Sequence, residues 1–376
     1  MRVALIHYWL VNWRGGEKVL RAIADLLPDA DIFTHVADPE IVSQRFPNRN
    51  VKTTFIANLP FAQRFYQSYL PLMPLALEQL DLRGYDLVIS SEAGPAKGVL
   101  VSPNTTHVCY CHSPMRYAWD MYHDYHEQSG PITRMLMGPL LHYMRLWDQT
   151  SAQRVDRYIA NSQFVAKRIE KYYRRTSDVI YPPVAVDSFD ASRPAEEFYL
   201  WVGQLVRYKR PDLLVEAFNE LKRPLVVIGD GEMLPMLRRM AKSNVRVLGR
   251  QPFDVIRDYY ARCRALVFPG IEDFGMVPVE AMASGKPVIA FHLGGARETV
   301  IDEFSGILFQ EQTAAALKEA IERFESIEDK FDPQAIRAHA RQFSETAFKE
   351  RFRSVIANLN CGGKPEPIVS LARKVG

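Results

Sequence analysis

The chain has 376 residues, which at roughly 150 residues per domain favours two domains. Its 47 basic and 44 acidic residues give a net charge of +3, which excludes the basic excess typical of proteins that bind nucleic acid in bulk. The chain starts directly on a strand-like run without a signal-peptide core, and no stretch reaches the ~20 apolar residues of a membrane span. These features predict a cytoplasmic protein.

Short apolar runs alternate along the chain with longer stretches of helical periodicity. In the first half the pattern predicts strands at 3–7, 32–36, 87–90, 108–111 and 158–161. In the second half it predicts strands at 199–202, 225–228, 245–248, 265–268, 288–290 and 306–309. The intervening helices include 17–27, 211–221 and 314–324. Because strand–helix alternation requires crossover connections, we expect parallel α/β sheets.

The break between the halves is expected near Tyr181–Asp187, where two consecutive prolines cannot continue a helix. We therefore predict two doubly wound domains, residues 1–185 and 186–343, facing each other across a cleft. An amphipathic helix over 344–360 is expected to cross back to the first domain, and 361–376 is expected to be a loosely ordered tail. Cys109 and Cys111 precede His112, but no second ligand pair supports a zinc site, so we expect two buried core residues.

The motif with the clearest chemistry follows the strand at 265–268. Glu272 lies in a loop, Gly275 permits an unusual backbone turn, and a helix is predicted over 276–284. The first amides of that helix suit a phosphate group. Glu280 is the one acid in an otherwise apolar helix, and seven residues separate it from Glu272. A carboxylate in that position needs a partner if it is buried, which favours a functional role.

Polar residues also follow the strands at 199–202 and 3–7. The segment Gly203–Pro211 contains Lys209, with Gln204 directly after the glycine and Arg207 nearby. The segment Asn12–Lys18 contains the pair Gly15 and Gly16, and a glycine pair allows close backbone approach, although any tight turn can use one.

A dense polar and aromatic run, Cys111–Asp120, follows the strand at 108–111. His112 ends that strand and is therefore expected at the edge of the cleft. The further candidate residues of this run are Arg116, Trp119 and Asp120.

These motifs together resemble the retaining glycosyltransferases of sequence family four, which have the GT-B fold of two Rossmann-like domains. Glu272 and Glu280 match the family's Glu-x7-Glu pattern, and 283–290 and 294–298 also resemble the family. Lys209 matches the family lysine, whereas Gln204 stands where the family has arginine, so that Arg207 is the nearest replacement in sequence.

The resemblance implies a role for each site residue. Glu272 would contact the donor-sugar hydroxyls, and Glu280 would hold the ribose hydroxyls. Lys209 would neutralise the leaving diphosphate. The remaining donor-side residues would be Gly15, Gly16, Gln204, Arg207, Arg250, Phe274, Gly275, Met276 and Val277. No metal or other cofactor is expected, because cationic side chains and amides would replace it.

The run from His112 to Asp120 resembles the bacterial O-antigen mannosyltransferase branch of the family. The resemblance implies that His112 lies near the reacting sugar and that Arg116, Trp119 and Asp120 shape the acceptor side. It also implies GDP-mannose as donor and a saccharide or lipid-linked saccharide as acceptor. A UDP-sugar transferase of the same fold is the main alternative. A nucleotide-sugar epimerase and a non-catalytic sugar-binding protein are more distant ones.

Two segments, 61–70 and 135–147, mix aromatic, apolar and basic residues. Such segments either pack as ordinary core helices or lie in a bilayer interface. The sequence leaves both possibilities open, and peripheral contact with the inner face of a membrane is the expectation that goes with a lipid-linked acceptor.

Overall fold

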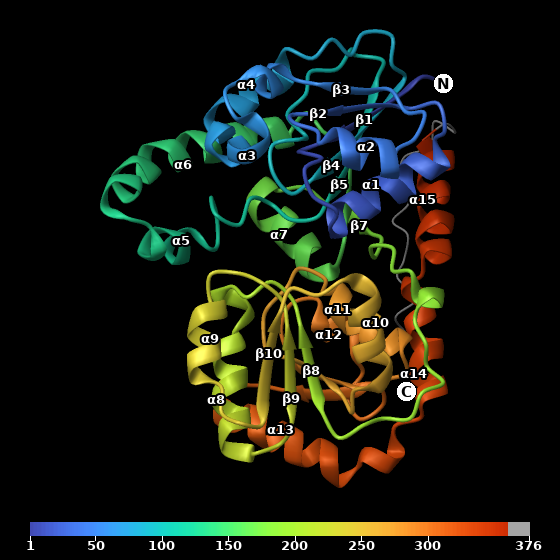
Figure 1. Cartoon of the computed structure of the whole chain (residues 1–376). Helices are drawn as coiled ribbons and strands as arrows, with labels where there is room; N and C mark the ends of the chain where they lie inside the picture. Colours follow the sequence, from blue (N-terminus) through green and yellow to red (C-terminus); the bar gives the residue numbers. More distant parts are fainter. Residues whose placement is uncertain (360–376) are drawn as a thin grey trace. The chain divides into compact units, whose positions relative to one another are not determined.

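The computed structural model describes residues 1–359, with Gln128 described by its backbone alone. The chain divides into two compact units, one of residues 1–181 together with residues from 348 onward and one of residues 182–347. Each unit is built on one parallel sheet with helices on its faces (Figure 1). The predicted tail 361–376 lies outside the described residues.

The first unit contains a seven-stranded parallel sheet. Its order is β3 (Val51–Thr53), β2 (Asp31–Thr34), β1 (Val3–His7), β4 (Leu87–Glu92), β5 (Thr106–Cys111), β6 (Arg157–Ala160), β7 (Ser177–Val179). All residues of β1 and β4 are buried, because helices cover both faces of the sheet.

Helices and short 3₁₀ turns connect these strands. They are α1 (Gly15–Leu26), α2 (Pro39–Arg45), η1 (Phe55–Asn58), α3 (Ala62–Phe65), η2 (Tyr66–Leu72), α4 (Met73–Glu78), α5 (Tyr122–Gln128), α6 (Pro131–Ala152) and α7 (Gln163–Tyr173). The last helix, α15 (Glu345–Leu359), places Phe348, Phe352 and Val355 in the buried cluster that contains Leu5 of β1. The hydrophobic core of this unit thus includes side chains from the end of the described chain.

The second unit contains a six-stranded parallel sheet. Its order is β10 (Val245–Gly249), β9 (Leu225–Ile228), β8 (Tyr199–Val202), β11 (Leu266–Phe268), β12 (Val288–Phe291), β13 (Gly306–Phe309). The other elements are η3 (Val186–Ser188), η4 (Arg207–Lys209), α8 (Pro211–Leu221), α9 (Leu234–Met240), α10 (Phe253–Arg262), α11 (Met276–Ala283), α12 (Ala296–Thr299), α13 (Ala314–Ser326), η5 (Glu328–Lys330), α14 (Pro333–Ala340) and η6 (Arg341–Phe343).

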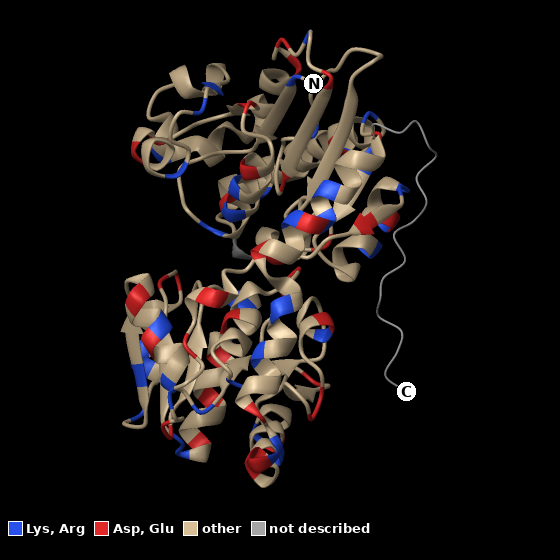
Figure 2. Cartoon of the chain, turned by 90° about the vertical axis from the view of Figure 1, so that its right-hand side faces the viewer, with Lys and Arg blue, Asp and Glu red and all other residues tan. Residues whose placement is uncertain are grey.

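The two doubly wound parallel sheets confirm the predicted fold class. Local signals place the helix ends: the Ser162 hydroxyl accepts from the Val165 amide at 3.0 Å, and that of Thr313 accepts from the Ala316 amide at 3.2 Å. Figure 2 shows Lys and Arg interspersed with Asp and Glu on the face in view, as the near balance of charge in the sequence predicts.

Candidate functional site

The strand order of the second sheet identifies a position for a ligand. From β8 the chain winds outward through β9 to β10, and from the neighbouring β11 it winds the other way through β12 to β13. Ligands of open α/β sheets bind beyond the carboxyl ends of the strands at such a switch point. The loops that follow β8 and β11 are therefore the candidate site of this unit.

These two loops meet through an ion pair. Lys209 Nζ lies 2.6 Å from Glu272 Oε1, and both side chains are partly buried. The close packing of the loops depends on Gly270, because a Cβ atom there would lie 2.6 Å from the Lys209 Cα atom. A short, partly buried pair of this kind is stronger than one exposed to water.

The loop after β11 then leads into α11 through Gly275, which has a φ of +82°. The Met276 and Val277 amides begin the helix and have no acceptor within it, and Pro278 carries no amide hydrogen. The Gly295 amide donates to the Glu272 carbonyl at 2.9 Å and fixes the loop from the other side. Two backbone donors, at positions 276 and 277, thus follow Glu272 in the same loop-to-helix segment.

Phe274 contributes to this loop through its backbone. Its side chain is buried, and the ring centroid lies 5.7 Å from that of Phe343. A Cβ atom at position 295 would lie 2.1 Å from the Phe274 carbonyl oxygen, so only glycine allows the following loop to pack there. The ring of Phe274 is therefore part of the core of the unit.

Glu280 is buried inside α11, where the Tyr260 hydroxyl donates to its Oε2 atom at 3.1 Å. Burial and the nearby Glu280 carboxylate raise the pKa of Tyr260 well above its ordinary value, so the phenol remains a proton donor. The sequence analysis does not identify Tyr260, because an aromatic residue within an amphipathic helix carries no signal of its own.

Three other predicted donor residues are exposed around the same edge of the sheet. Gln204 and Arg207 follow β8, and Arg250 follows β10. Arg207 lines a hollow of about 530 Å³ together with Arg210, Asp212, Glu232, Met233 and Met236. Neither Lys209 nor Glu272 is among these lining residues.

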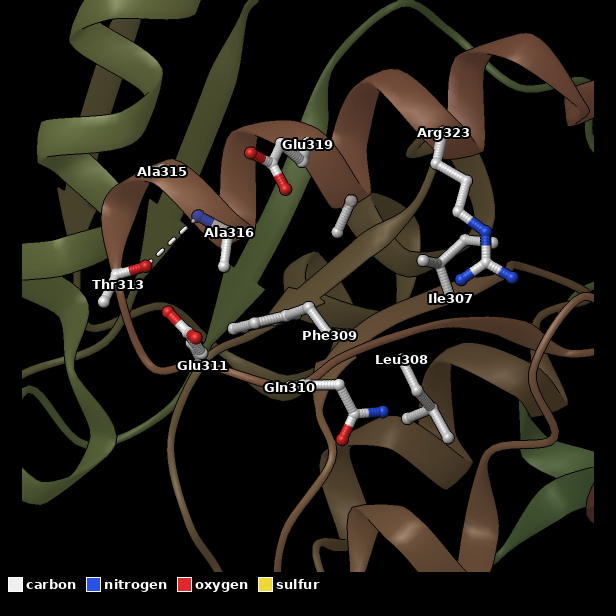
Figure 3. Close-up of a pocket in the computed structure, with 11 residues that line it drawn as sticks. Ile307, Leu308, Phe309, Gln310, Glu311, Thr313, Ala315, Ala316, Glu319 and Arg323 are labelled. Atoms are coloured by element: carbon white, nitrogen blue, oxygen red, sulfur yellow. Dashed lines mark hydrogen bonds between the residues drawn. The ribbon is translucent and has the colours of Figure 1, made fainter.

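A second hollow of about 470 Å³ lies between β13 and α13 (Figure 3). Its polar lining includes Thr313, whose hydroxyl caps α13 by accepting from the Ala316 amide, and Arg323, whose guanidinium pairs with Asp302. None of the predicted site residues lines this hollow.

The sheet of the first unit also has a switch point, between β1 and β4. Gly15 and Gly16 begin α1, which follows β1, and His112 follows β5. A Cβ atom on Gly16 would lie 2.2 Å from the Tyr8 hydroxyl and 3.7 Å from His112 Nε2. The glycine pair and His112, which were predicted from separate motifs, therefore lie close together at the same edge of the first sheet.

His112 is fixed by two contacts with β4. Its Nε2 atom lies 2.9 Å from the Ser91 hydroxyl, and its amide donates to the Glu92 carbonyl at 2.7 Å. Burial of the ring, with a smaller contribution from His7, lowers the pKa of His112 to about 3. The imidazole is consequently neutral at pH 7.

His7 is a buried histidine at this edge that the sequence analysis does not identify. Both ring nitrogens are buried without a hydrogen-bond partner among the residues that the structure describes, and Nε2 lies 3.8 Å from Glu17 Oε1. Glu17 is also buried, and it accepts from the Arg14 amide at 2.8 Å. The sequence pattern does not single out His7, because its neighbours in the strand-like run at 3–7 are apolar.

The predicted acceptor-side residues are bound into the first unit. The Trp119 indole donates to Asp148 Oδ2 at 2.7 Å, and its ring stacks on Tyr172 at 4.8 Å. Asp120 forms an ion pair with Arg168. Arg116 precedes them in the same loop and is half-buried.

A buried ionic network lies beside this loop and was not predicted. The ammonium of Lys97 lies 3.1 Å from Glu92 Oε1 and also pairs with Asp148, and all three side chains are fully buried. Tyr173 donates to Asp148 as well, at 3.0 Å. The network joins the end of β4 to α6 and α7, so it holds the strand end that supports His112.

Fold and site together define a class. Two doubly wound parallel sheets, each with polar residues gathered at the carboxyl ends of the central strands, form a GT-B architecture. Residues 13–188 match a family described as Glycosyltransferase Family 4, and residues 187–349 match one described as Glycosyl transferases group 1. One family thus matches most of the first unit and the other most of the second, so each unit is similar to a domain of these glycosyltransferase families.

Individual relatives agree with this assignment. An uncharacterized glycosyltransferase of Methanocaldococcus jannaschii is 33% identical over 171 residues, 44% of this chain and 48% of the relative. A D-inositol 3-phosphate glycosyltransferase of Mycolicibacterium smegmatis is 29% identical over 223 residues, 52% of this chain and 51% of the relative. The chain thus spans about half the length of these curated relatives.

Two solved structures share the fold over nearly the whole chain. Sucrose-phosphate synthase from Thermosynechococcus elongatus superposes with a TM-score of 0.74 at 19% identity, over 96% of this chain and 100% of that one. Anabaena HepE in complex with UDP and glucose superposes with a TM-score of 0.69 at 18% identity, over 95% of this chain and 99% of that one.

Proposed function

We propose that this protein transfers a hexose from a nucleoside-diphosphate sugar to an acceptor hydroxyl, with retention of anomeric configuration. The observation that carries the proposal is the Lys209–Glu272 pair at the switch point of the second sheet, where the loop that carries Glu272 leads into the first amides of α11. A cation and two backbone donors suit a diphosphate, and a carboxylate beside them suits sugar hydroxyls.

The reaction breaks the bond between the anomeric carbon and a diphosphate oxygen. Lys209 and the Met276 and Val277 amides would stabilise the negative charge that develops on the diphosphate. Glu272 would orient the sugar through its hydroxyls. The acceptor oxygen forms the new bond from the face of the leaving group, and its proton passes to a phosphate oxygen. The mechanism uses no metal ion.

The nucleoside would be held by Glu280. A carboxylate accepts two hydrogen bonds from a vicinal diol, which matches the 2′- and 3′-hydroxyls of ribose. The Tyr260 hydroxyl already occupies one lone-pair direction of Oε2 and so orients the carboxylate. Gln204, Arg207 and Arg250 surround the same edge and are the proposed outer donor contacts.

In the first unit, His112 is the proposed group near the reacting sugar and the acceptor. Its neutral imidazole is positioned by Ser91 and the Glu92 carbonyl. Gly15 and Gly16 offer close backbone approach beside it. Arg116, Trp119 and Asp120 would shape the acceptor side, with Trp119 and Asp120 held in place by Asp148 and Arg168.

We propose GDP-mannose as donor and a saccharide or lipid-linked saccharide of bacterial surface polysaccharide as acceptor, on the resemblance of 112–120 to mannosyltransferases. UDP-sugars are the second candidate, because Anabaena HepE has been solved with UDP and with UDP-glucose. Phosphorylated polyols are an alternative acceptor class, suggested by the D-inositol 3-phosphate glycosyltransferases among the relatives.

Calorimetric titration of GDP, UDP and ADP tests the donor base. GDP is expected to bind at least about tenfold more tightly, a difference of about 1.4 kcal/mol. Tighter binding of UDP would overturn the GDP-mannose proposal and leave glycosyl transfer intact. Sugar transfer is then assayed with the favoured donor. Epimerised donor without transfer, or binding without turnover, would contradict the proposed activity.

A further inference from the structure

Helix α6 has apolar side chains on two of its faces. Towards the body of the first unit, Leu141 and Met144 are buried in a cluster with Met115 and Ala118. The helix packs on the unit through this inner face, as an amphipathic helix of a globular protein does. In Figure 1 the part of α6 that follows α5 extends away from the sheet of the unit.

The outer face of α6 is also apolar. Ile132 is 74% exposed and Met135 is 72% exposed, and Leu136, Tyr143 and Leu146 are exposed as well. Positions 132, 136, 143 and 146 repeat at helical spacing, so they form one stripe along the helix. An amphipathic helix that only covers a core would carry polar residues on this face.

A second exposed apolar group lies next to α6. Phe61 is 76% exposed, and Phe65, Leu72 and Leu75 are exposed on the short helices from α3 to α4. Leu70 of η2 packs against the buried cluster of α6, and the Trp147 indole donates to Glu78 at 3.1 Å. The two groups therefore belong to one region of the first unit, which we call the α3–α6 surface.

The exposed charged side chains among these apolar residues are basic. The sequence has no acidic residue between Glu40 and Glu78 and none between Glu127 and Asp148, although acidic and basic residues are nearly balanced in the whole chain. Arg64 and Arg134 are exposed within these segments. Arg134 donates hydrogen bonds to backbone carbonyl oxygens, among them that of His126. These acceptors are uncharged, so they do not neutralise the positive charge of Arg134.

We propose that the α3–α6 surface docks this protein on a lipid bilayer that contains anionic lipids. Exposed aromatic and aliphatic side chains enter the interfacial region, and the arginines among them contact anionic headgroups. No helix within residues 1–359 is both long and apolar enough to cross a bilayer, so the surface lies on the membrane. The acidic residues Asp124 and Glu127 belong to α5, which is not part of the proposed docking surface.

Vesicle sedimentation of the full chain without nucleotide tests the proposal, so its result does not depend on the proposed activity. Vesicles of phosphatidylcholine with phosphatidylglycerol are expected to bind the protein, less at high salt, and vesicles of phosphatidylcholine alone to bind it more weakly. The double variant I132E/L136E is expected to bind the mixed vesicles at least about tenfold more weakly than the wild type. Arg134→Glu is expected to weaken binding to the mixed vesicles alone.

The matched control is Ile301→Glu in the second unit, where the wild-type side chain is 48% exposed. It introduces one carboxylate, half the charge that I132E/L136E adds, on an exposed aliphatic residue and is expected to leave vesicle binding unchanged. Circular dichroism verifies that each variant is folded. The proposal would be overturned if I132E/L136E bound vesicles as tightly as the wild type, or if the wild type bound both kinds of vesicle equally. It would also be overturned if the wild type did not bind vesicles and formed a dimer in light scattering that the I132E/L136E substitutions dissociate. A second copy of the chain would then cover the surface.

Discussion

Lys209 and Glu272 form an ion pair of 2.6 Å between the loops that follow two neighbouring strands, β8 and β11. A diphosphate that binds at Lys209 has to compete with the Glu272 carboxylate for the same ammonium group. The two residues are therefore expected to affect ligand binding in opposite directions, although both are proposed to contact the reacting donor.

Substitution of the pair separates these roles. Lys209→Met is expected to lower nucleoside-diphosphate affinity by about tenfold or more and kcat by about 100-fold, because it removes the cation that is proposed to face the leaving group. Glu272→Gln is expected to lower kcat while affinity for the free diphosphate stays equal or rises, because the competing carboxylate is gone. Calorimetry and steady-state kinetics measure both effects. The control is Lys242→Met, which removes an exposed lysine of the same unit.

Wild-type affinity in Lys209→Met would place the diphosphate elsewhere. Full transfer activity in both Lys209→Met and Glu272→Gln would show that the switch point of this sheet is not the reacting site.

Glu280 and Tyr260 allow the ribose contact to be tested with a modified ligand. Glu280→Ala is expected to weaken binding of the ribonucleoside diphosphate by about tenfold, because the hydroxyls lose a charged acceptor. Tyr260→Phe removes only the hydrogen bond that orients the carboxylate, so a loss of about fivefold is expected. The wild type should bind the 2′,3′-dideoxy nucleotide more weakly than the ribonucleotide. Glu280→Ala should bind the two nucleotides equally. If Glu280→Ala still discriminates the two nucleotides, Glu280 does not hold the ribose.

The strands that the sequence predicts most closely are those with continuous apolar runs. The predicted bounds of β1, β8, β9 and β13 agree with the structure, since each is an apolar run with clear end signals. The edge strands β3 and β7 were missed. Each has only three residues, none of them buried, so neither the length nor the burial that marks a strand is present.

The contacts of the candidate site depend on strand order, which alternation of strands and helices does not encode. Lys209 and Glu272 were predicted separately from their motifs, but their pairing follows only because β8 and β11 are neighbours. The partner of Glu280 was expected on physical grounds, since a buried carboxylate needs one. Its identity, Tyr260, depends on how α10 packs against α11 and could not be read from spacing.

Gly16 is expected to tolerate no side chain while Tyr8 keeps its hydroxyl. A Cβ atom there would lie 2.2 Å from the Tyr8 oxygen but 3.3 Å from the ring carbon that bears it. Gly16→Ala should therefore destabilise the protein by about 1–3 kcal/mol and reduce activity through displacement of Tyr8. The double variant G16A/Y8F should recover most of the stability.

Urea unfolding measures these variants, with Gly138→Ala as the control. A Cβ atom on Gly138 meets no atom within 4 Å, and alanine favours the helix, so no loss of stability is expected there. Equal destabilisation of G16A and G16A/Y8F would show that the Tyr8 hydroxyl is not what excludes a side chain.

Metal removal should leave the reaction intact. Lys209 and the amides of α11 are proposed to supply the stabilisation that a divalent cation gives in other phosphate sites. Sugar transfer is therefore expected to proceed at the same rate in excess EDTA as in added Mg²⁺ or Mn²⁺. A strict requirement for either ion would contradict the proposed mechanism.

His107 is expected to make the first unit sensitive to acid. It is fully buried, and its Nε2 atom lies 2.9 Å from the Ser90 hydroxyl. Burial, together with the charges of Arg154 and Lys97, lowers the pKa of His107 from its ordinary 6.5 to about 3. Between these values the unfolded chain binds a proton that the folded chain does not, so stability falls as the pH falls from 6.5 towards 3.

At pH 5 this one group should remove about 2 kcal/mol of the free energy of unfolding that is present at pH 8. His107→Gln removes the titrating ring, so the variant should lose that much less stability over the same pH interval, whatever its stability at pH 8. Tryptophan fluorescence during urea unfolding reports mainly this unit, because Trp9, Trp13, Trp119 and Trp147 all lie in it. The exposed His123, replaced by glutamine, provides the control and should retain the pH dependence of the wild type. Equal loss of stability in the wild type and His107→Gln would show that the buried imidazole is not the group that titrates.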